Sequence, residues 1–419
     1  MISIISSFSA LFLAAFCFLM GTGMLSTVLS LRMNLEGFST HITGLIMAFY
    51  YMGLLAGFFI CHYVIERVGH IRALTAFVAV ATICVMVYGL YLSATTWALL
   101  RFLSGIASFG LFMVIESWLS ELTDSSQRGR VFSIYMVMTY LGSGFGQQMI
   151  KLGEVQGEDL FLIVGILLSL SMIPIAVTKA AHPALPKRER YRFGLLLHKS
   201  PLGVLGCLSA GLINSAFLAM TPVFASQIGL NVAQISWLMS VGVLGGLSLQ
   251  WVVGTLSDHY DRTLIILLLG ISVAALTLFL YFSETRSFPW LMVEMGSLGG
   301  LAFTIYPTAV ARAQDVFEGK NAVAVSAGLL LAYSIGASLG PIAASAMMGV
   351  MRNPYGLFAY WAVISSLFTG SVFYFRHAER IKFVRTDEQV AFFPMRDTSP
   401  VATQFDPRNE TADMPESTG

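Results

Sequence analysis

Long runs of apolar residues recur along the whole chain, separated for the most part by short polar segments. A run of roughly 20 mostly apolar residues is what an α-helix needs to cross the hydrocarbon core of a bilayer. The runs do not alternate apolar with polar residues, so helices rather than membrane β-strands are predicted. The twelve predicted spans are 8–30, 42–64, 73–93, 97–119, 131–150, 159–178, 202–225, 234–256, 263–283, 289–311, 322–350 and 355–375.

The composition supports the same interpretation. Hydrophobic residues make up 56% of the 419 residues and charged residues only 11%, against roughly 25% charged residues in soluble domains. The net charge of +1 gives no basic footprint for a nucleic-acid partner. The four cysteines are scattered through apolar runs without metal-binding spacing, so we expect no metal and no cofactor. The lipid bilayer is the predicted environment.

Lysine and arginine predict the orientation. With the N-terminus in the cytoplasm, nineteen of these residues fall in cytoplasmic segments and four (Arg32, Lys151, Arg286 and Arg352) in outer loops. Cytoplasmic loops carry the excess of positive charge in membrane proteins. We therefore expect both termini to be cytoplasmic.

The polar segments divide the chain into four parts. We expect a six-helix half over 1–178, a cytoplasmic linker over 179–201, a second six-helix half over 202–377 and a tail over 378–419. The basic stretch 187–199 is predicted to lie on the anionic inner leaflet. The tail is rich in acidic, hydroxyl and proline residues, so it is predicted to be disordered and solvated.

An internal repeat at an offset of about 193 residues relates the two halves. The stretches 65–72 and 256–262 match, as do 128–137 and 320–329 and the helix starts at Trp97 and Trp290. A Gly-x-x-x-Gly motif also occurs in both halves, as Gly142 with Gly146 and as Gly336 with Gly340. Small residues four apart allow close helix packing. Two halves in the same orientation are typical of alternating-access transporters, which bind solute between the halves.

One short loop carries a motif with intelligible chemistry. It contains Gly254, Asp258, Asp261 and Arg262. Glycine permits close helix approach, the aspartate can accept hydrogen bonds from a helix N-terminus, and the arginine can pair with a carboxylate. Such a latch would hold one conformation and release in another. The loop resembles the G-x-L-x-D-x-x-x-R signature of the major facilitator superfamily.

The first-half copy of this loop departs from the signature. His62 replaces the glycine and Glu66 replaces the aspartate, while Arg67, Gly69 and Arg72 remain. We therefore expect a weaker or differently paired first latch.

Further stretches resemble the YcaD-like branch of the superfamily. They are 114–122, 128–148, 303–315 and 329–341, and Pro341 completes a Gly-Pro motif in the last of them. The resemblance spans about residues 10–375. It implies an all-α fold of 12 transmembrane helices in two pseudo-symmetric six-helix halves, secondary transport and a monomer in a bacterial cytoplasmic (inner) membrane. It implies no particular solute.

Ionisable side chains inside a membrane span are rare and tend to be functional. Glu116 either carries a proton or belongs to a latch with Arg67 or Arg72, and we favour the latch because its helix ends one turn later. Arg101 and Glu294 occupy nearly equivalent places in the two halves. They form a charge pair or solute clamp, or they extend to the outer interface, as long side chains do near helix ends. An anionic solute would favour a role for Arg101. Glu294 is a second candidate for carrying a proton, but for this residue we favour the interface.

Several uncharged polar residues also lie within predicted spans. Gln147, Asn214, Tyr306 and Tyr333 are candidates for lining a solute cavity. Each is also explained by ordinary helix packing.

The leading hypothesis is a proton-coupled secondary transporter of a small organic solute. A uniporter and a transporter-like sensor are the alternatives. A primary pump is disfavoured because the chain has no G-x-x-x-x-G-K-[ST] loop. A membrane enzyme is disfavoured because H-E-x-x-H and G-x-S-x-G motifs are absent.

Overall fold

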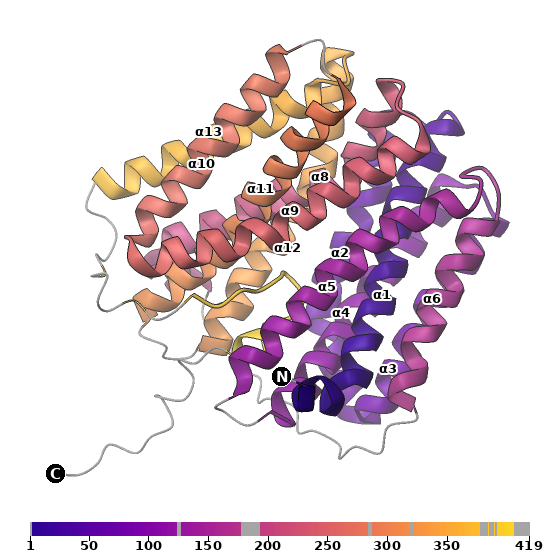
Figure 1. Cartoon of the computed structure of the whole chain (residues 1–419), viewed down its shortest axis with the longest axis horizontal. Coiled ribbons are helices and arrows are strands. Elements are labelled where there is room, and N and C mark those ends of the chain that lie inside the picture. Colours follow the sequence, from indigo (N-terminus) through magenta and orange to yellow (C-terminus); the bar gives the residue numbers. More distant parts are fainter. Residues whose placement is uncertain are drawn as a thin grey trace.

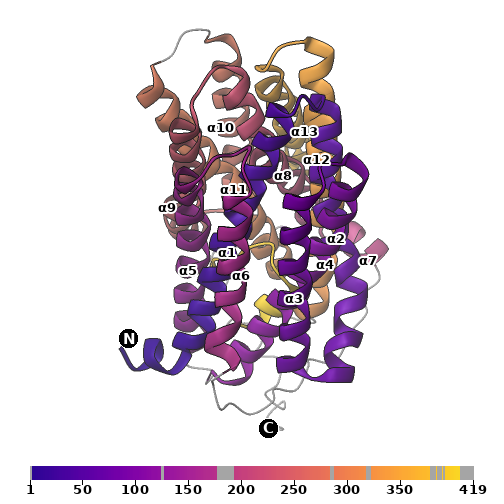
Figure 2. The ribbon, with the colours of Figure 1, turned by 90° about the vertical axis from the view of Figure 1, so that its right-hand side faces the viewer.

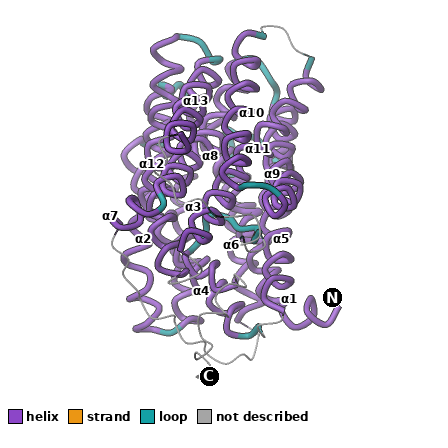
Figure 3. The backbone as a smooth tube through the Cα atoms, turned by 90° about the vertical axis from the view of Figure 1, so that its left-hand side faces the viewer, coloured by secondary structure: helices purple, strands orange, loops and turns teal. Residues whose placement is uncertain are grey.

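The computed structural model describes residues 2–123, 127–176, 193–283, 287–317, 322–377, 384, 389 and 392–405. Helices account for nearly all of these residues (Figure 3). The long helices are α1 (Ile2–Leu35), α2 (Thr40–Val68), α3 (His70–Leu90), α4 (Ala94–Glu121), α5 (Arg128–Met149), α6 (Asp159–Ala176), α8 (Pro201–Gln227), α9 (Val232–His259), α10 (Arg262–Phe282), α11 (Phe288–Phe317), α12 (Ala322–Met351) and α13 (Gly356–His377). Short helices are η2 (Ile150–Leu152), α7 (Phe193–Lys199) and η4 (Pro400–Phe405).

Each predicted span coincides with one long helix, which confirms the helical fold class. Among the described residues, eleven helices are long and apolar enough to cross a membrane. The helix outside that set is α5, whose sequence holds two arginines, two glutamines and several hydroxyl residues. Polar residues are expected on a helix that faces a cavity rather than lipid.

The two six-helix halves, α1–α6 and α8–α13, repeat the same helix packing. Gly142 and Gly146 of α5 face α1, and Gly336 and Gly340 of α12 face α8. A Cβ atom at Gly142 would lie only 2.6 Å from the carbonyl oxygen of Phe16, so the backbones are too close for a side chain. The repeated Gly-x-x-x-Gly motif therefore marks equivalent helix contacts in the two halves.

The halves meet at one end of the bundle and diverge towards the other (Figure 1). Successive helices run in opposite directions, so the start of α1 and the ends of α2, α4 and α9 lie at the same end, here called the basic end. Figure 2 shows the start of α1 at this end. At the opposite end, the Asn34 amide donates to the Ser226 hydroxyl at 3.0 Å. There α2 also approaches α12 so closely that a Cβ on Gly44 would lie 2.5 Å from the Pro341 carbonyl oxygen.

The tail provides the main correction to the predicted organisation. We expected residues 378–419 to be disordered, but residues 392–405 run back between the two halves (Figure 1). Phe393, Met395, Val401 and Ala402 are each less than 5% exposed. The segment has too few apolar residues to form a core alone, but the two halves supply apolar surface for it. Of the rest of the tail, only residues 384 and 389 are described.

The predicted linker is described only in part. Residues 177–192 lie outside the described residues, and with them most of the basic stretch 187–199. Residues 193–199 form α7, which packs against α8 and α12.

Candidate solute-binding cavity

A cavity of about 110 Å³ lies between the halves. Most of its lining comes from α1, α2, α4 and α5, and the other half contributes Leu218, Val243 and Phe303. The tail segment also reaches the cavity, through residues 396–398. A central cavity with an apolar lining and a few polar groups is the usual form of a small-molecule site.

Arg101 projects into this cavity from α4. Its side chain is only 3% exposed, and its guanidinium carbon lies 4.6 Å from the centre of the Tyr50 ring. Among the described residues, no hydrogen bond or ion pair involves this guanidinium. Burying an uncompensated charge costs several kcal/mol, whereas a cation–π contact returns about 0.5–2 kcal/mol. The site is therefore suited to an anionic group.

Glu294 does not share the cavity with Arg101. It is 6% exposed in α11 and is absent from the cavity lining. Of the two residues, only Arg101 therefore lines the cavity.

Glu116 is fully buried on α4 and is surrounded by hydroxyl groups. The Tyr135 hydroxyl donates to its Oε1 at 3.1 Å. The hydroxyls of Thr398 and Ser399, from the tail segment, donate to the two carboxylate oxygens. Because a hydroxyl can donate or accept, these partners fit either a carboxylate or a carboxylic acid.

The latch that we favoured for Glu116 is therefore wrong. Arg67 and Arg72 are exposed at the basic end and make no ion pair with it. The carboxylate instead faces the space between α4, α5 and the tail segment. Sequence spacing along α4 could not reveal this, since two of its partners lie more than 280 residues away.

Gln147 both ties helices together and lines the cavity. Its side-chain oxygen accepts from the Thr27 hydroxyl at 2.7 Å, and its amide donates to the Gly23 carbonyl at 2.9 Å. Both partners belong to α1. These bonds fix the α1–α5 contact and satisfy the polar atoms of a residue that is only 1% exposed.

The three candidates in the second half lie together. Asn214, Tyr306 and Tyr333 are each at most 5% exposed, and the two tyrosine rings are 5.0 Å apart. They are absent from the lining of the cavity. Asp397 of the tail segment lies beside the Tyr333 hydroxyl. This polar cluster thus faces the segment rather than the open space.

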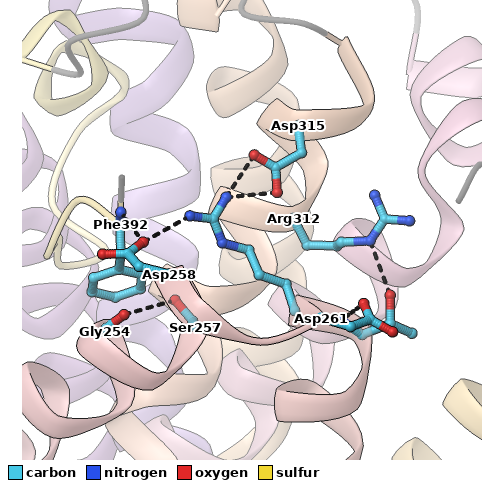
Figure 4. Close-up of polar contacts among 9 residues, drawn as sticks. Gly254, Ser257, Asp258, Asp261, Arg312, Asp315 and Phe392 are labelled. Carbon is cyan, nitrogen blue, oxygen red and sulfur yellow. Dashed lines mark hydrogen bonds and ion pairs between the residues drawn. The ribbon is translucent and has the colours of Figure 1, made fainter. Parts of the chain in front are cut away.

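The second-half loop forms a buried latch (Figure 4). The Arg262 side chain has no exposed area, and its Nη1 donates to both Asp315 oxygens at 2.5 and 2.6 Å. Its Nη2 donates to Asp258 at 3.1 Å. Asp261 caps α10 by accepting from the Thr263 amide at 2.8 Å. We predicted no role for Asp315, although an acidic residue near the end of α11, opposite a basic loop, could have indicated one.

The first-half loop forms no comparable latch among the described residues. Glu66 is 64% exposed and lies 3.8 Å from a His62 ring nitrogen. Arg67 and Arg72 are exposed. Gly69 lies between α2 and α3 with φ +84°, a conformation that favours glycine. The first-half loop therefore has the glycine turn but lacks the carboxylate–arginine contact that the second-half loop makes.

Two similar six-helix halves around a central cavity, closed at one end, are typical of membrane transporters. The sequence matches the profile of the Major Facilitator Superfamily over residues 11–293 and 202–406. The chain belongs to this family of membrane transporters.

Curated relatives support this assignment. A protein of Escherichia coli O17:K52:H18 named "Uncharacterized MFS-type transporter YcaD" is 30% identical over 323 residues, which cover 76% of this chain and 82% of the relative. Its namesake in Shigella flexneri serotype 5b is 29% identical over 330 residues, covering 78% and 84%. The similarity to the YcaD-like branch is thus confirmed.

Solved structures share the fold. A mutant form of the nucleoside transporter NupG matches with a TM-score of 0.73 at 12% identity, covering 87% of this chain and 98% of NupG. A bacterial homologue of the human lysosomal transporter Spinster, inward-facing and occupied, matches with a TM-score of 0.68 at 17% identity, covering 92% and 98%. At these identities the likeness concerns the fold alone.

Proposed function

We propose that this chain is a proton-coupled secondary transporter of a small organic solute that carries a negative charge. The solute binds in the central cavity, and the two halves rock around it by alternating access. The basic end faces the cytoplasm of a bacterial inner membrane, since the positive residues gather there. The fold functions as a monomer.

The observation that supports the solute class is Arg101. A buried guanidinium that pairs with no carboxylate among the described residues needs an anion to offset its desolvation. Tyr50, Tyr51 and Ser104 line the cavity with it and supply aromatic surface and hydroxyl groups. A small organic carboxylate with an apolar body fits this lining.

Glu116 is the proposed proton site. It is buried, and its side-chain partners among the described residues are the hydroxyls of Tyr135, Thr398 and Ser399 rather than a cation. Such surroundings accept the group with or without its proton. Coupling requires that the proton and the solute favour the same conformation.

The test uses proteoliposomes with a trapped pH dye and a library of organic carboxylates. We expect a carboxylate to drive proton movement with the wild-type protein. Arg101→Ala should abolish binding, and Glu116→Gln should abolish proton movement but keep binding. If only uncharged or cationic solutes move, the anion assignment is wrong. If solute flux persists unchanged in Glu116→Gln at all pH values, Glu116 is not the proton site.

A further inference from the structure

The segment 392–405 lies across the solute pathway on the basic side of the cavity. Its Arg396, Asp397 and Thr398 form part of the cavity wall. It reaches this position from the end of α13, after both halves are complete in the sequence. It contacts both halves, and these contacts are polar as well as apolar.

Contacts with the first half bury side chains of the segment. The Phe393 ring stacks on Phe132 of α5, with ring centres 4.7 Å apart and planes 25° apart. Thr398 and Ser399 donate to Glu116. Both hydroxyl residues are at most 5% exposed. The segment therefore satisfies a buried carboxylate that would otherwise keep only the Tyr135 bond.

Arg396 is held by an aromatic ring of the cavity. Its guanidinium carbon lies 4.6 Å from the centre of the Tyr140 ring, and its Nη1 donates to the Ser143 hydroxyl at 3.3 Å. Both partners also line the cavity. The segment thus occupies surface that a bound solute would meet.

Contacts with the second half join the segment to the latch loop (Figure 4). The Phe392 amide donates to Asp258 at 2.5 Å, and the Gln250 amide donates to the Met395 carbonyl at 3.0 Å. A Cβ atom on Gly254 would lie 2.6 Å from the Phe392 ring, so glycine leaves the space that this ring fills. Asp258 therefore bonds at once to Arg262 and to the segment.

We propose that residues 392–405 are a tethered ligand of the central cavity, which competes with the transported solute and keeps the halves apart at the basic end. This proposal rests on the transport function proposed above. Alternating access requires the basic end to close around the site, and a segment wedged between the halves prevents that closure. A tether gives an effective concentration in the ~mM range, so even a weakly binding segment remains docked.

The test measures access to the cavity and needs no solute. Ser26 lines the cavity and forms no hydrogen bond with the described part of the tail, so Ser26→Cys serves as the reporter. The four native cysteines are buried, and the parent protein provides the blank. Labelling of detergent-purified protein by a polyethylene glycol maleimide is followed by gel shift. A chain that ends at Val390 should be labelled at least ~10-fold faster than the full chain, since the accessible state becomes dominant.

Adding the segment back distinguishes docking from an effect of truncation. A synthetic peptide of residues 391–405 should restore slow labelling to the shortened chain. The same peptide with Thr398→Glu and Ser399→Glu should not, because two carboxylates would be buried against Glu116. A peptide without effect would overturn the proposal.

Substitutions in the full chain provide the matched control. Thr398→Glu with Ser399→Glu should accelerate labelling to the rate of the shortened chain. Ser417→Glu with Thr418→Glu adds the same charge at another pair of adjacent hydroxyl residues, outside the segment, and should leave the labelling rate unchanged. Equal labelling of the full and shortened chains, or equal acceleration by both charged pairs, would overturn the proposal.

The two proposals fail in different ways. If the full and shortened chains are labelled at the same rate, the tethered-ligand proposal is rejected and the transport proposal is unaffected. The labelling rate could instead depend on the segment while the shortened chain transports no carboxylate in proteoliposomes. That result would reject the proposed solute class and leave the docking of the segment supported.

Discussion

At the scale of single residues, Arg101 and Glu116 place two ionisable groups on one helix with different surroundings. Arg101 faces open cavity beside an aromatic ring. Glu116 is enclosed by hydroxyls from α5 and the tail segment. Because α4 rises 1.5 Å per residue, the two charges are separated by about 22 Å. They therefore interact with different partners and need not neutralise each other.

The uncompensated burial of Arg101 predicts a conflict between stability and activity. Arg101→Met keeps the apolar stem and removes the charge, so the free energy of unfolding should rise by about 1–3 kcal/mol. Binding of organic carboxylates should be lost. Thermal unfolding in detergent, without solute, measures the first effect. A lower melting temperature would mean that the guanidinium stabilises the fold.

At the scale of elements, the latch joins the α9–α10 loop to α11. Removing one partner from a buried ion pair leaves the other uncompensated. Asp315→Asn should therefore lower the free energy of unfolding by about 3–5 kcal/mol. Glu121→Gln, at the exposed end of α4, is the matched control and should change it by less than about 0.5 kcal/mol. Chemical denaturation compares the two variants, and equal effects would contradict a buried latch.

Close helix contacts in the first half depend on glycine, which has no side chain. Gly146→Ala would place a Cβ against the Met20 carbonyl of α1. The helices must then separate, at a cost of about 1–3 kcal/mol. Gly370→Ala in α13 has nothing within 4 Å of the new atom, so it should be neutral or stabilise by up to about 1 kcal/mol. Melting temperatures of the two variants test this, and a milder effect at Gly146 would reject the close contact.

At the scale of the whole molecule, the halves are joined at the end opposite the basic end. Asn34 and Ser226 meet there across the two halves. A disulfide between Asn34→Cys and Ser226→Cys should hold this end closed and stop solute exchange, since alternating access requires it to open. Reductant should restore exchange, and each single cysteine should leave it unchanged. If the disulfide-linked variant exchanges solute as fast as the reduced one, this end does not have to open during transport.

Much of the architecture was predictable from the sequence. Long apolar runs indicate the spanning helices, and the repeat located the glycine contacts of α5 and α12. Helix ends were less predictable, because α1 and α2 continue past the apolar core that defines a span. The loop chemistry predicted that Arg262 pairs with a carboxylate. Which carboxylate it is could not be predicted, because Asp315 reaches Arg262 only through the packing of α11 against the loop.

The least predictable feature was the position of residues 392–405. Composition shows whether a segment can form its own core, and this one cannot. It does not show whether two distant halves offer a surface that the segment can fill. The partners of Glu116 were missed for the same reason, because they are neighbours in space and not along the chain.

The position of the segment within the chain has a consequence for biosynthesis. Chains are made from the N-terminus, and residues 392–405 emerge only after every spanning helix has been synthesised. Docking of the segment is therefore the last step of assembly, and it requires both halves to be in place. A chain interrupted between α13 and Phe392 would insert into the membrane with both halves complete but without the segment in its cavity, so the state of the tail distinguishes a full-length molecule from an interrupted one.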